Sequence, residues 1–321
     1  MCRITSMLRG VAVCLVLEVL LMGCGTVGER AGKSGTAGEN YGKLYLVGMG
    51  TAPDLITVRG VKAIKSADII VVHDPEALED WKEYIGKKEA WVFERYNLLF
   101  FGSDPNTLEE PADRAIAEEY KSNCYKIVQK IRSEVEKGKT VAILENGDAM
   151  MYGESFYLEL LPKDFPSEVV PGVGSFQAAS AAVKMSPPYG WDTSAVILTM
   201  SDWDGRVDTN EKLMEAGATM VFYTMHLDYD KVFNELKRHY PENTPVAIVC
   251  NAGNLEQQKV ITSTIGSFFD EVDLESLPPD AHLMLVGKFL TSGQARKDGL
   301  LNGRKFIEMM RYKNREQSEE N

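Results

Sequence analysis

The stretch "KLYLVGMGTAPDLITVRGVKAIKSADIIVVHD", residues 43–74, decides the fold class. An apolar run ends at a Gly-x-Gly turn, a segment with helical periodicity follows, and a second apolar run closes the unit. This order predicts a strand, a helix and a second strand in a βαβ unit. The third glycine of a dinucleotide-binding G-x-G-x-x-G fingerprint is absent, and Thr51-Ala52-Pro53-Asp54 stands there instead. The loop is therefore either a degraded fingerprint or a loop for another ligand.

The same alternation continues along the chain. Helical patterns follow many of the strands, at residues 55–67 with Asp54 as the cap, 123–138, 175–185 and 228–240. Short apolar runs bounded by Gly, Pro, Asn or Asp predict strands at residues 43–47, 68–72, 90–93, 140–144, 167–170, 195–200, 219–223, 246–250, 259–264 and 282–286. The pattern predicts an α/β fold of two domains, each a sheet flanked by helices, with a ligand cleft between them.

Two irregular segments set the expected domain organisation. The stretch "PKDFPSE" at residues 162–168 predicts a boundary between an N-terminal domain (43–165) and a C-terminal domain (166–292), followed by a helix and polar tail (293–321). Residues 95–123 are long for a connection, so they form either a functional flap or a solvated insertion with one extra helix.

The first residues have the layout of a secretory signal. Arg3 and Arg9 precede an apolar run at residues 11–22, which is too short to span a membrane comfortably, and Gly23-Cys24 follows. Residues 21–24 resemble the lipobox of bacterial lipoproteins, which implies a signal peptide over residues 1–23 and a lipidated Cys24. The alternatives are a wrongly assigned start or an ordinary N-terminal anchor.

A glycine-rich segment at residues 25–42 predicts a flexible tether after this signal. The expected location is the outer, periplasmic face of a membrane, held by the lipid anchor. If the signal interpretation is wrong, the expected location is the cytoplasm.

Composition excludes some function classes. A net charge of −12 argues against a surface for nucleic acid. There is no C-x-x-C motif and the four histidines are scattered, so no metal site is expected. Cys124 and Cys250 lie in the mature domain; Cys250 is expected to be buried, and a disulfide between the two stays open.

Three glycine turns follow predicted strands, at residues 48–54, 147–153 and 171–174. In open α/β sheets, ligands bind at the carboxyl ends of strands. Glycine allows the backbone to approach a flat ligand closely. Together the three turns predict a ligand site at one edge of the sheet.

The ordered set of turns resembles the tetrapyrrole methylase family, S-adenosylmethionine-dependent enzymes that methylate uroporphyrinogen III and the precorrins. The first loop is similar to G-x-G-P-G-D-P-x-L-L-T with one residue fewer. The second, "GDAMMYG", is similar to G-D-P-x-x-Y-G, and the third, "PGVGSFQAAS", to P-G-V-S-S. The resemblance continues through "MVFYTM", "TPVAIVCNAGNLEQQ" and "HLMLVGKFL", and covers residues 43–290. It implies that the first loop is not a broken dinucleotide fingerprint, and that the chain is a homodimer.

The resemblance also implies roles for individual residues. S-adenosyl-L-methionine is the implied methyl donor, and the residues implied to contact it are Gly147, Asp148, Met151, Gly174, Ser175, Thr224 or Met225, and Ala247. The first loop is implied to line the substrate side through Gly48, Gly50 and Thr51. Trp203 is a further candidate that would stack on a flat ligand. Departures such as Thr51-Ala52 in place of Pro-Gly cluster on the substrate side, which favours a changed substrate over a lost donor site.

Few residues are candidates for a general base or for binding the carboxylates of a substrate. His73 and Asp74 end the second strand, where related enzymes carry an aspartate, so they are either a general base or a surface pair. Carboxylates of an early tetrapyrrole would attract arginine, and the candidates are Arg59, Arg95, Arg114 and Arg206. The loops at residues 103–113 and 200–208 are acidic, which favours a corrinoid-like or other macrocycle over an octacarboxylate.

The predicted activity is methyl transfer from S-adenosylmethionine to a carbon of a tetrapyrrole- or corrinoid-like substrate. The export signal conflicts with a cytoplasmic donor. An alternative is therefore an exported lipoprotein that keeps the cleft to bind a tetrapyrrole, corrinoid or nucleoside without catalysis. A third, less supported, is a structural lipoprotein with an empty cleft.

Overall fold

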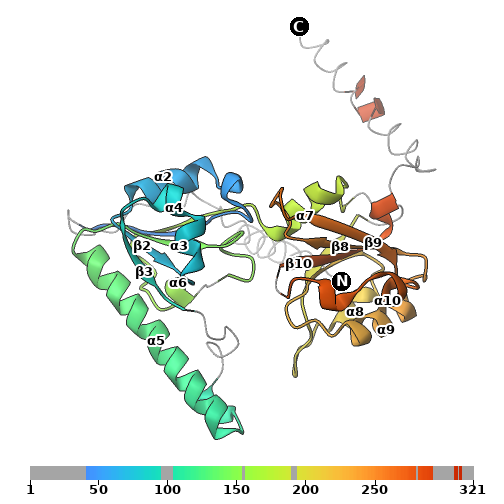
Figure 1. Ribbon diagram of the computed structural model, residues 1–321, viewed down its shortest axis with the longest axis horizontal. Coiled ribbons are helices and arrows are strands. Elements are labelled where there is room, and N and C mark those ends of the chain that lie inside the picture. Colours follow the sequence, from blue (N-terminus) through green and yellow to red (C-terminus); the bar gives the residue numbers. More distant parts are fainter. Residues whose placement is uncertain are drawn as a thin grey trace, which may run out of the picture.

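The computed structural model describes residues 41–94, 104–153, 156–188, 194–279, 281–291, 307–309 and 311–312. Its strands form two five-stranded sheets, each covered by helices, and these make two lobes that lie side by side (Figure 1). The predicted signal peptide, Cys24, nearly all of the tether and Arg95 lie outside the described residues.

The first lobe is built on a wholly parallel sheet with the strand order β3-β2-β4-β1-β5. Its strands β2 and β4 are apolar except for Glu145 at the end of β4, because both faces of the sheet are covered. On one face lie η1, α2, α3 and α4, and on the other α5 and α6 (Figure 1). The strands are β1 (Leu44–Gly48), β2 (Ile69–Val72), β3 (Glu89–Val92), β4 (Val141–Glu145) and β5 (Ser167–Val170). The helices are η1 (Pro53–Leu55), α2 (Val58–Ser66), α3 (Glu76–Asp80), α4 (Lys82–Ile85), η3 (Pro105–Thr107), α5 (Pro111–Glu136) and α6 (Phe156–Glu159).

The second lobe is built on a mixed sheet with the order β6-β7-β10-β8-β9, in which only β6 and β7 are parallel neighbours. Helix α7 covers one face, and α8, α9 and α10 cover the other. The strands are β6 (Val196–Thr199), β7 (Thr219–Tyr223), β8 (Pro245–Cys250), β9 (Lys259–Thr264) and β10 (His282–Val286). The helices are α7 (Ser175–Val183), α8 (Asn210–Met214), α9 (Tyr229–His239), α10 (Phe268–Glu271), η4 (Leu274–Ser276) and η5 (Lys288–Thr291).

All ten predicted strands are present, but the predicted domain boundary is wrong. Strand β5 pairs in parallel with β1, with Leu44 opposite Ser167, so it completes the first sheet and does not open the second. A boundary after residue 165 would separate this strand from its partner. The chain instead passes to the second lobe after Val170, through the turn that leads into α7.

Two local predictions also need correction. Helix α2 begins at Val58, because the Thr57 side chain accepts a hydrogen bond from the Gly60 N–H at 3.0 Å; Asp54 lies in η1 and is not the cap. In the segment 95–123, residues from Pro111 onward form the first half of the 26-residue helix α5, which extends past the edge of the sheet (Figure 1). The flap prediction otherwise falls largely on residues 95–103, which lie outside the described part.

Within the described residues, no helix has the length and apolar character needed to cross a membrane. The same part of the chain holds no group of three or more potential metal ligands. Cys124 lies in the core beneath α5 and Cys250 in the core beneath α9, so the two do not form a disulfide.

Candidate functional site

The three glycine turns meet at the carboxyl edge of the first sheet. Gly50 and Gly147 exchange two backbone hydrogen bonds, of 3.0 and 2.9 Å. A Cβ atom on Gly172 would lie 2.0 Å from the Gly147 carbonyl oxygen, and one on Gly48 would lie 2.5 Å from the Gly172 nitrogen. The backbones of the three turns are thus in direct contact, and at Gly48 and Gly172 only glycine fits.

Asp148 ties the second turn to the third. One carboxylate oxygen accepts the Met150 N–H at 2.9 Å, and the other accepts the Gly172 N–H at 3.0 Å. Hydrogen bonds to a carboxylate are stronger than neutral ones. Asp148 therefore holds the predicted donor loop in place, and Gly174 and Ser175 begin α7 directly beyond it.

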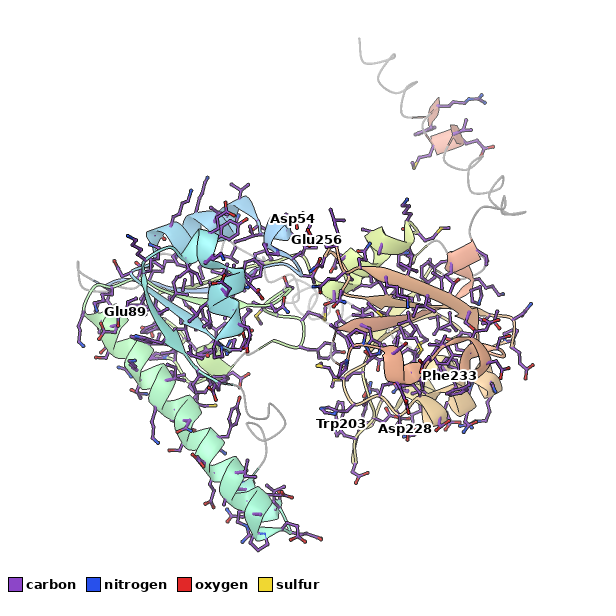
Figure 2. All side chains as sticks on the ribbon, in the orientation of Figure 1. Asp54, Glu89, Trp203, Asp228, Phe233 and Glu256 are labelled. Atoms are coloured by element: carbon purple, nitrogen blue, oxygen red, sulfur yellow. The ribbon has the colours of Figure 1, made fainter. Side chains whose placement is uncertain are left out.

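The second lobe presents four segments at the edge of its sheet that faces these turns. Strands β6, β7 and β8 end there and β10 begins there, because β10 runs antiparallel to β7 and β8. Thr224 and Met225 follow β7, and the Thr224 hydroxyl donates to the His282 carbonyl oxygen at 2.6 Å. Trp203 lies in the loop after β6, on the side of the second lobe that faces the first (Figure 2). The topology thus brings these predicted residues to one edge.

The glycine turns of the first lobe and the facing edge of the second lobe border a cavity of about 190 Å³. It is lined by Thr51, Asn146, Ser175, Val249, Asn251, Ala252, Asn254, Ala281, His282 and Leu283. A Cβ atom on Gly253 would lie 2.4 Å from the Thr51 hydroxyl oxygen and 2.7 Å from a Leu55 methyl carbon, so the lobes are in close contact here. Asp54 and Glu256 mark this junction in Figure 2. The buried Thr51 hydroxyl has no hydrogen-bond partner in the described part of the chain, which points to a polar ligand.

A pair of tyrosines forms a second contact between the lobes. The ring of Tyr152, from the second glycine turn, meets the ring of Tyr223 at the end of β7, with 4.7 Å between centroids in an edge-on arrangement. Burial raises the pKa of Tyr223 to about 12, and the neighbouring Tyr152 and Asp148 add to the shift. Burial also raises the pKa of Tyr152. Both phenols are therefore neutral at physiological pH.

Backbone strain is concentrated at this edge. Tyr152, His226 and Asn251 adopt left-handed conformations, with φ of +57°, +55° and +48°. Non-glycine residues rarely adopt this conformation, and it costs free energy that the surrounding structure must supply. All three follow cleft-edge strands, so the strain coincides with the candidate site.

The structure does not support His73 or Asp74 as a general base. The His73 Nε2 atom lies 2.9 Å from a Glu145 carboxylate oxygen and its Nδ1 atom lies 3.3 Å from the Phe93 carbonyl oxygen, so both ring nitrogens face a partner. His73 and Glu145 are 9% and 1% exposed. Asp74 is exposed and accepts the Ala77 N–H at 2.6 Å, at the start of α3. His73 thus positions the end of β4, and Asp74 stabilises a helix.

Other predicted residues also lie away from the cleft surface. Ala247 is fully buried in the middle of β8, whose strand is paired on both sides, with β9 and β10. The Arg206 side chain is buried and bonded to Asp202, Thr199 and Asp208, with its guanidinium 5.0 Å from the Trp203 ring. Arg114 donates to the Leu108 carbonyl oxygen at the start of α5, and Arg59 is exposed on α2. The three predicted arginines within the described residues therefore do not gather into a carboxylate site.

Several cleft residues were missed by the sequence prediction. They are Asn146, Tyr152, Tyr223, Asn251, Asn254 and His282. The available signal was the polar residues directly after two buried strands, in "ENGD" and "CNAGN". At the carboxyl ends of strands such residues face the ligand side of the sheet.

Comparison with known proteins is consistent with this geometry. The sequence profile of the tetrapyrrole (corrin/porphyrin) methylases matches residues 43–268. A cobalt-precorrin-4 C(11)-methyltransferase of Methanocaldococcus jannaschii is 30% identical over 259 residues, which cover 78% of this chain and 90% of that protein.

Two solved structures share the fold. One is cobalt precorrin-4 methyltransferase, a cobalamin biosynthetic enzyme, with a TM-score of 0.60, 24% identity and coverage of 77% of this chain and 95% of that chain. The other is uroporphyrin-III C-methyltransferase of Thermus thermophilus, complexed with S-adenosylhomocysteine, with a TM-score of 0.55, 19% identity and coverage of 78% and 99%.

Proposed function

Because the chain belongs to the tetrapyrrole (corrin/porphyrin) methylase family, we propose that it is an S-adenosylmethionine-dependent methyltransferase. The acceptor is a carbon atom of a tetrapyrrole- or corrinoid-like macrocycle. Among its relatives, one methylates cobalt-precorrin-4 at C11, and a structural neighbour is complexed with S-adenosylhomocysteine. The observation that carries the proposal is the polar cavity where the three glycine turns meet the second lobe.

The residues of this cavity fit the donor. A nucleoside with an amino-acid tail needs hydrogen-bond donors and acceptors in a concave site. Asn146, Asn251 and Asn254 offer amides, and Thr51 and Ser175 offer hydroxyls, of which the Thr51 oxygen is buried without a partner among the described residues. The cavity of about 190 Å³ is smaller than the roughly 300 Å³ at which ligand pockets begin, so we expect the lobes to open slightly on binding.

Methyl transfer from a sulfonium requires little covalent help from the protein. The donor, when bound, supplies an already activated methyl group. The chain's own residues bind and orient the donor and the acceptor, and they exclude water. In-line alignment of the reacting atoms is their main contribution. The His73–Glu145 pair supports this role, because Glu145 directly precedes Asn146 and Gly147 and fixes the end of β4. The neutral phenols of Tyr152 and Tyr223 keep the contact between the lobes free of charge.

Titration calorimetry of the full chain with S-adenosylmethionine and S-adenosylhomocysteine tests the proposal. The matched pair of variants is Gly147→Ala and Gly86→Ala. Both glycines have positive φ, +69° and +64°, and neither has an atom closer than 3.9 Å to an added Cβ, so each variant adds a methyl group at a positive-φ position without a steric clash. We expect micromolar binding that Gly147→Ala weakens and Gly86→Ala leaves unchanged. No binding at millimolar ligand would overturn the donor assignment.

The N-terminal pattern favours a second candidate. We propose that Cys24 carries a lipid anchor and that the chain, as a homodimer, lies on the outer face of a membrane. There it would bind a macrocycle or nucleoside without turnover. Labelling of cells with a radioactive fatty acid, with Cys24→Ala as the control, tests the anchor. Protease protection in spheroplasts then separates an outward-facing binding protein from an inward-facing enzyme.

A further inference from the structure

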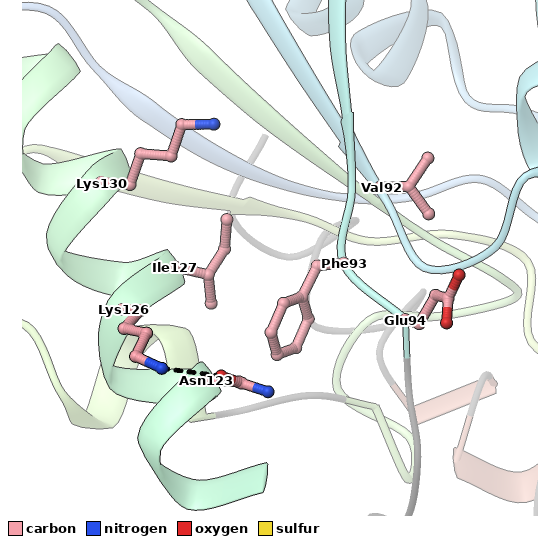
Figure 3. Close-up of a pocket in the computed structure, with 7 residues that line it drawn as sticks. All are labelled: Val92, Phe93, Glu94, Asn123, Lys126, Ile127 and Lys130. Atoms are coloured by element: carbon pink, nitrogen blue, oxygen red, sulfur yellow. Dashed lines mark hydrogen bonds between the residues drawn. The ribbon is translucent and has the colours of Figure 1, made fainter. Parts of the chain in front are cut away.

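An open pocket of about 430 Å³ lies at the carboxyl end of β3, where this edge strand meets α5 (Figure 3). It is lined by Val92, Phe93, Glu94, Asn123, Lys126, Ile127 and Lys130. Its volume is in the usual range for small-molecule sites. None of its residues takes part in the donor cavity.

The pocket combines an apolar floor with cationic groups on one side. Phe93 points toward α5 and lies beside Ile127, and both side chains are largely buried (Figure 3). Lys126 and Lys130 stand one helical turn apart on α5, on the same face. The Lys126 ammonium donates to the Asn123 side-chain oxygen at 3.2 Å, and the Lys130 ammonium lies 3.6 Å above the Trp91 ring.

The charge at the pocket is net positive, in a chain that is acidic overall. Glu94, the one acidic side chain among the described residues of the lining, lies across the strand from the two lysines (Figure 3). The present partners of the lysines are a neutral amide and an aromatic ring. A carboxylate binds an ammonium more strongly than either of these at a partly exposed site, so it can replace them.

A chain of contacts connects the pocket to the donor site. The Phe93 N–H donates to the Val72 carbonyl oxygen at 2.8 Å, and the Phe93 carbonyl oxygen faces His73. His73 in turn contacts Glu145, which leads into the second glycine turn. Strands β3 and β4 are separated only by β2, so their ends lie roughly 10 Å apart at the usual strand spacing. The pocket and the donor site therefore share one edge of one sheet.

We infer that this pocket anchors acidic side chains of the macrocyclic substrate, while the ring extends along the carboxyl edge of the first sheet toward the donor cavity. This assignment rests on the proposed function and gives one carboxylate arm of the macrocycle a binding place beside an apolar edge. Lys126 and Lys130 pair with the carboxylate, and Phe93 and Ile127 contact the adjoining carbon atoms. The lysines supply the positive charge that Arg59, Arg114 and Arg206 do not bring to the cleft.

The test uses uroporphyrin, a stable octacarboxylate macrocycle, as the probe, with the full chain and fluorescence titration. Lys126→Gln and Lys130→Gln, singly and together, remove the charges on the exposed side of a long helix. Lys121→Gln is the matched control, because Lys121 lies on the same helix but does not line the pocket. We expect each pocket variant to weaken binding roughly tenfold, as for the loss of one charge-assisted hydrogen bond. The control should be unchanged, and the difference should shrink at high salt.

Binding of S-adenosylhomocysteine to the same variants separates the two proposals. Unchanged nucleoside binding together with weakened porphyrin binding supports the pocket. If the double variant binds porphyrin as strongly as the parent, the assignment of the pocket as a carboxylate site is overturned, even if the nucleoside binds. Failure of the parent chain to bind S-adenosylhomocysteine overturns the proposed function instead. If Lys121→Gln lowers the porphyrin affinity as much as the pocket variants do, the porphyrin is attracted only to the general charge of α5. This result would also overturn the assignment of the pocket.

Discussion

Replacement of Gly172 by alanine should disrupt the contact among the three glycine turns. The new methyl group would lie 2.0 Å from the Gly147 carbonyl oxygen and 2.7 Å from the Gly48 carbonyl carbon. Both are backbone atoms, so no side chain can rotate away. Overpacking of this kind costs about 1–3 kcal/mol, and we expect the upper end. Alanine would otherwise stabilise by about 0.4–1 kcal/mol through the unfolded chain. The expected net loss is about 2 kcal/mol.

Thermal unfolding monitored by circular dichroism measures this loss. For a chain of 321 residues, about 2 kcal/mol corresponds to a drop in the midpoint of roughly 3 °C. Gly205→Ala is the control, because Gly205 has φ of +85° and nothing within 4 Å, so only backbone strain of about 1 kcal/mol applies. Gly172→Ala should also abolish binding of S-adenosylhomocysteine, while Gly205→Ala should not. A Gly172→Ala protein as stable as the parent, with unchanged affinity, would refute the close contact of the turns.

Three further predictions follow from the same contacts. Glu145→Ala leaves buried His73 without its hydrogen-bonded carboxylate, so we expect a loss of about 1–3 kcal/mol in urea unfolding, and an unchanged free energy of unfolding would contradict the buried hydrogen bond. Gly253→Ala would place a methyl group 2.4 Å from the Thr51 oxygen, so calorimetry should show weaker S-adenosylhomocysteine binding, with Gly86→Ala unaffected. The pKa of Tyr223, raised by burial to about 12, lies above the value of about 10 in an unfolded chain. Its contribution to stability is complete below pH 10 and is lost as the pH rises to 12. Urea midpoints between pH 9 and 12 should therefore fall less in Tyr223→Phe than in the parent.

The strands were predictable because each is a short apolar run bounded by turn residues, and a parallel sheet covered on both faces needs such runs. The domain boundary was not predictable, because "PKDFPSE" looks like a linker although it leads into β5. Only pairing with β1, more than 120 residues earlier in the chain, assigns this strand to the first sheet. The cap of α2 was misplaced because Asp54 and Thr57 are both good N-cap residues.

The three glycine turns were predictable from their positions after strands, but their mutual contacts were not. The pairing of His73 with Glu145 joins residues 72 positions apart and depends on the neighbouring ends of β2 and β4. The arginines were expected to serve a substrate, yet Arg206 is bound by its own loop. Local sequence gives the residue types at a strand end, whereas the strand order decides which of them meet.

The passage from β5 to α7 has a consequence for chimeric proteins. The described chain crosses between the two lobes once, through the turn that holds Gly172 and is bonded to Asp148. A junction placed at this natural boundary would therefore cut the third glycine turn from the second. Exchange of whole lobes between members of the family would recombine two halves of one donor site. Functional hybrids should require that residues 147–175 are inherited from a single parent.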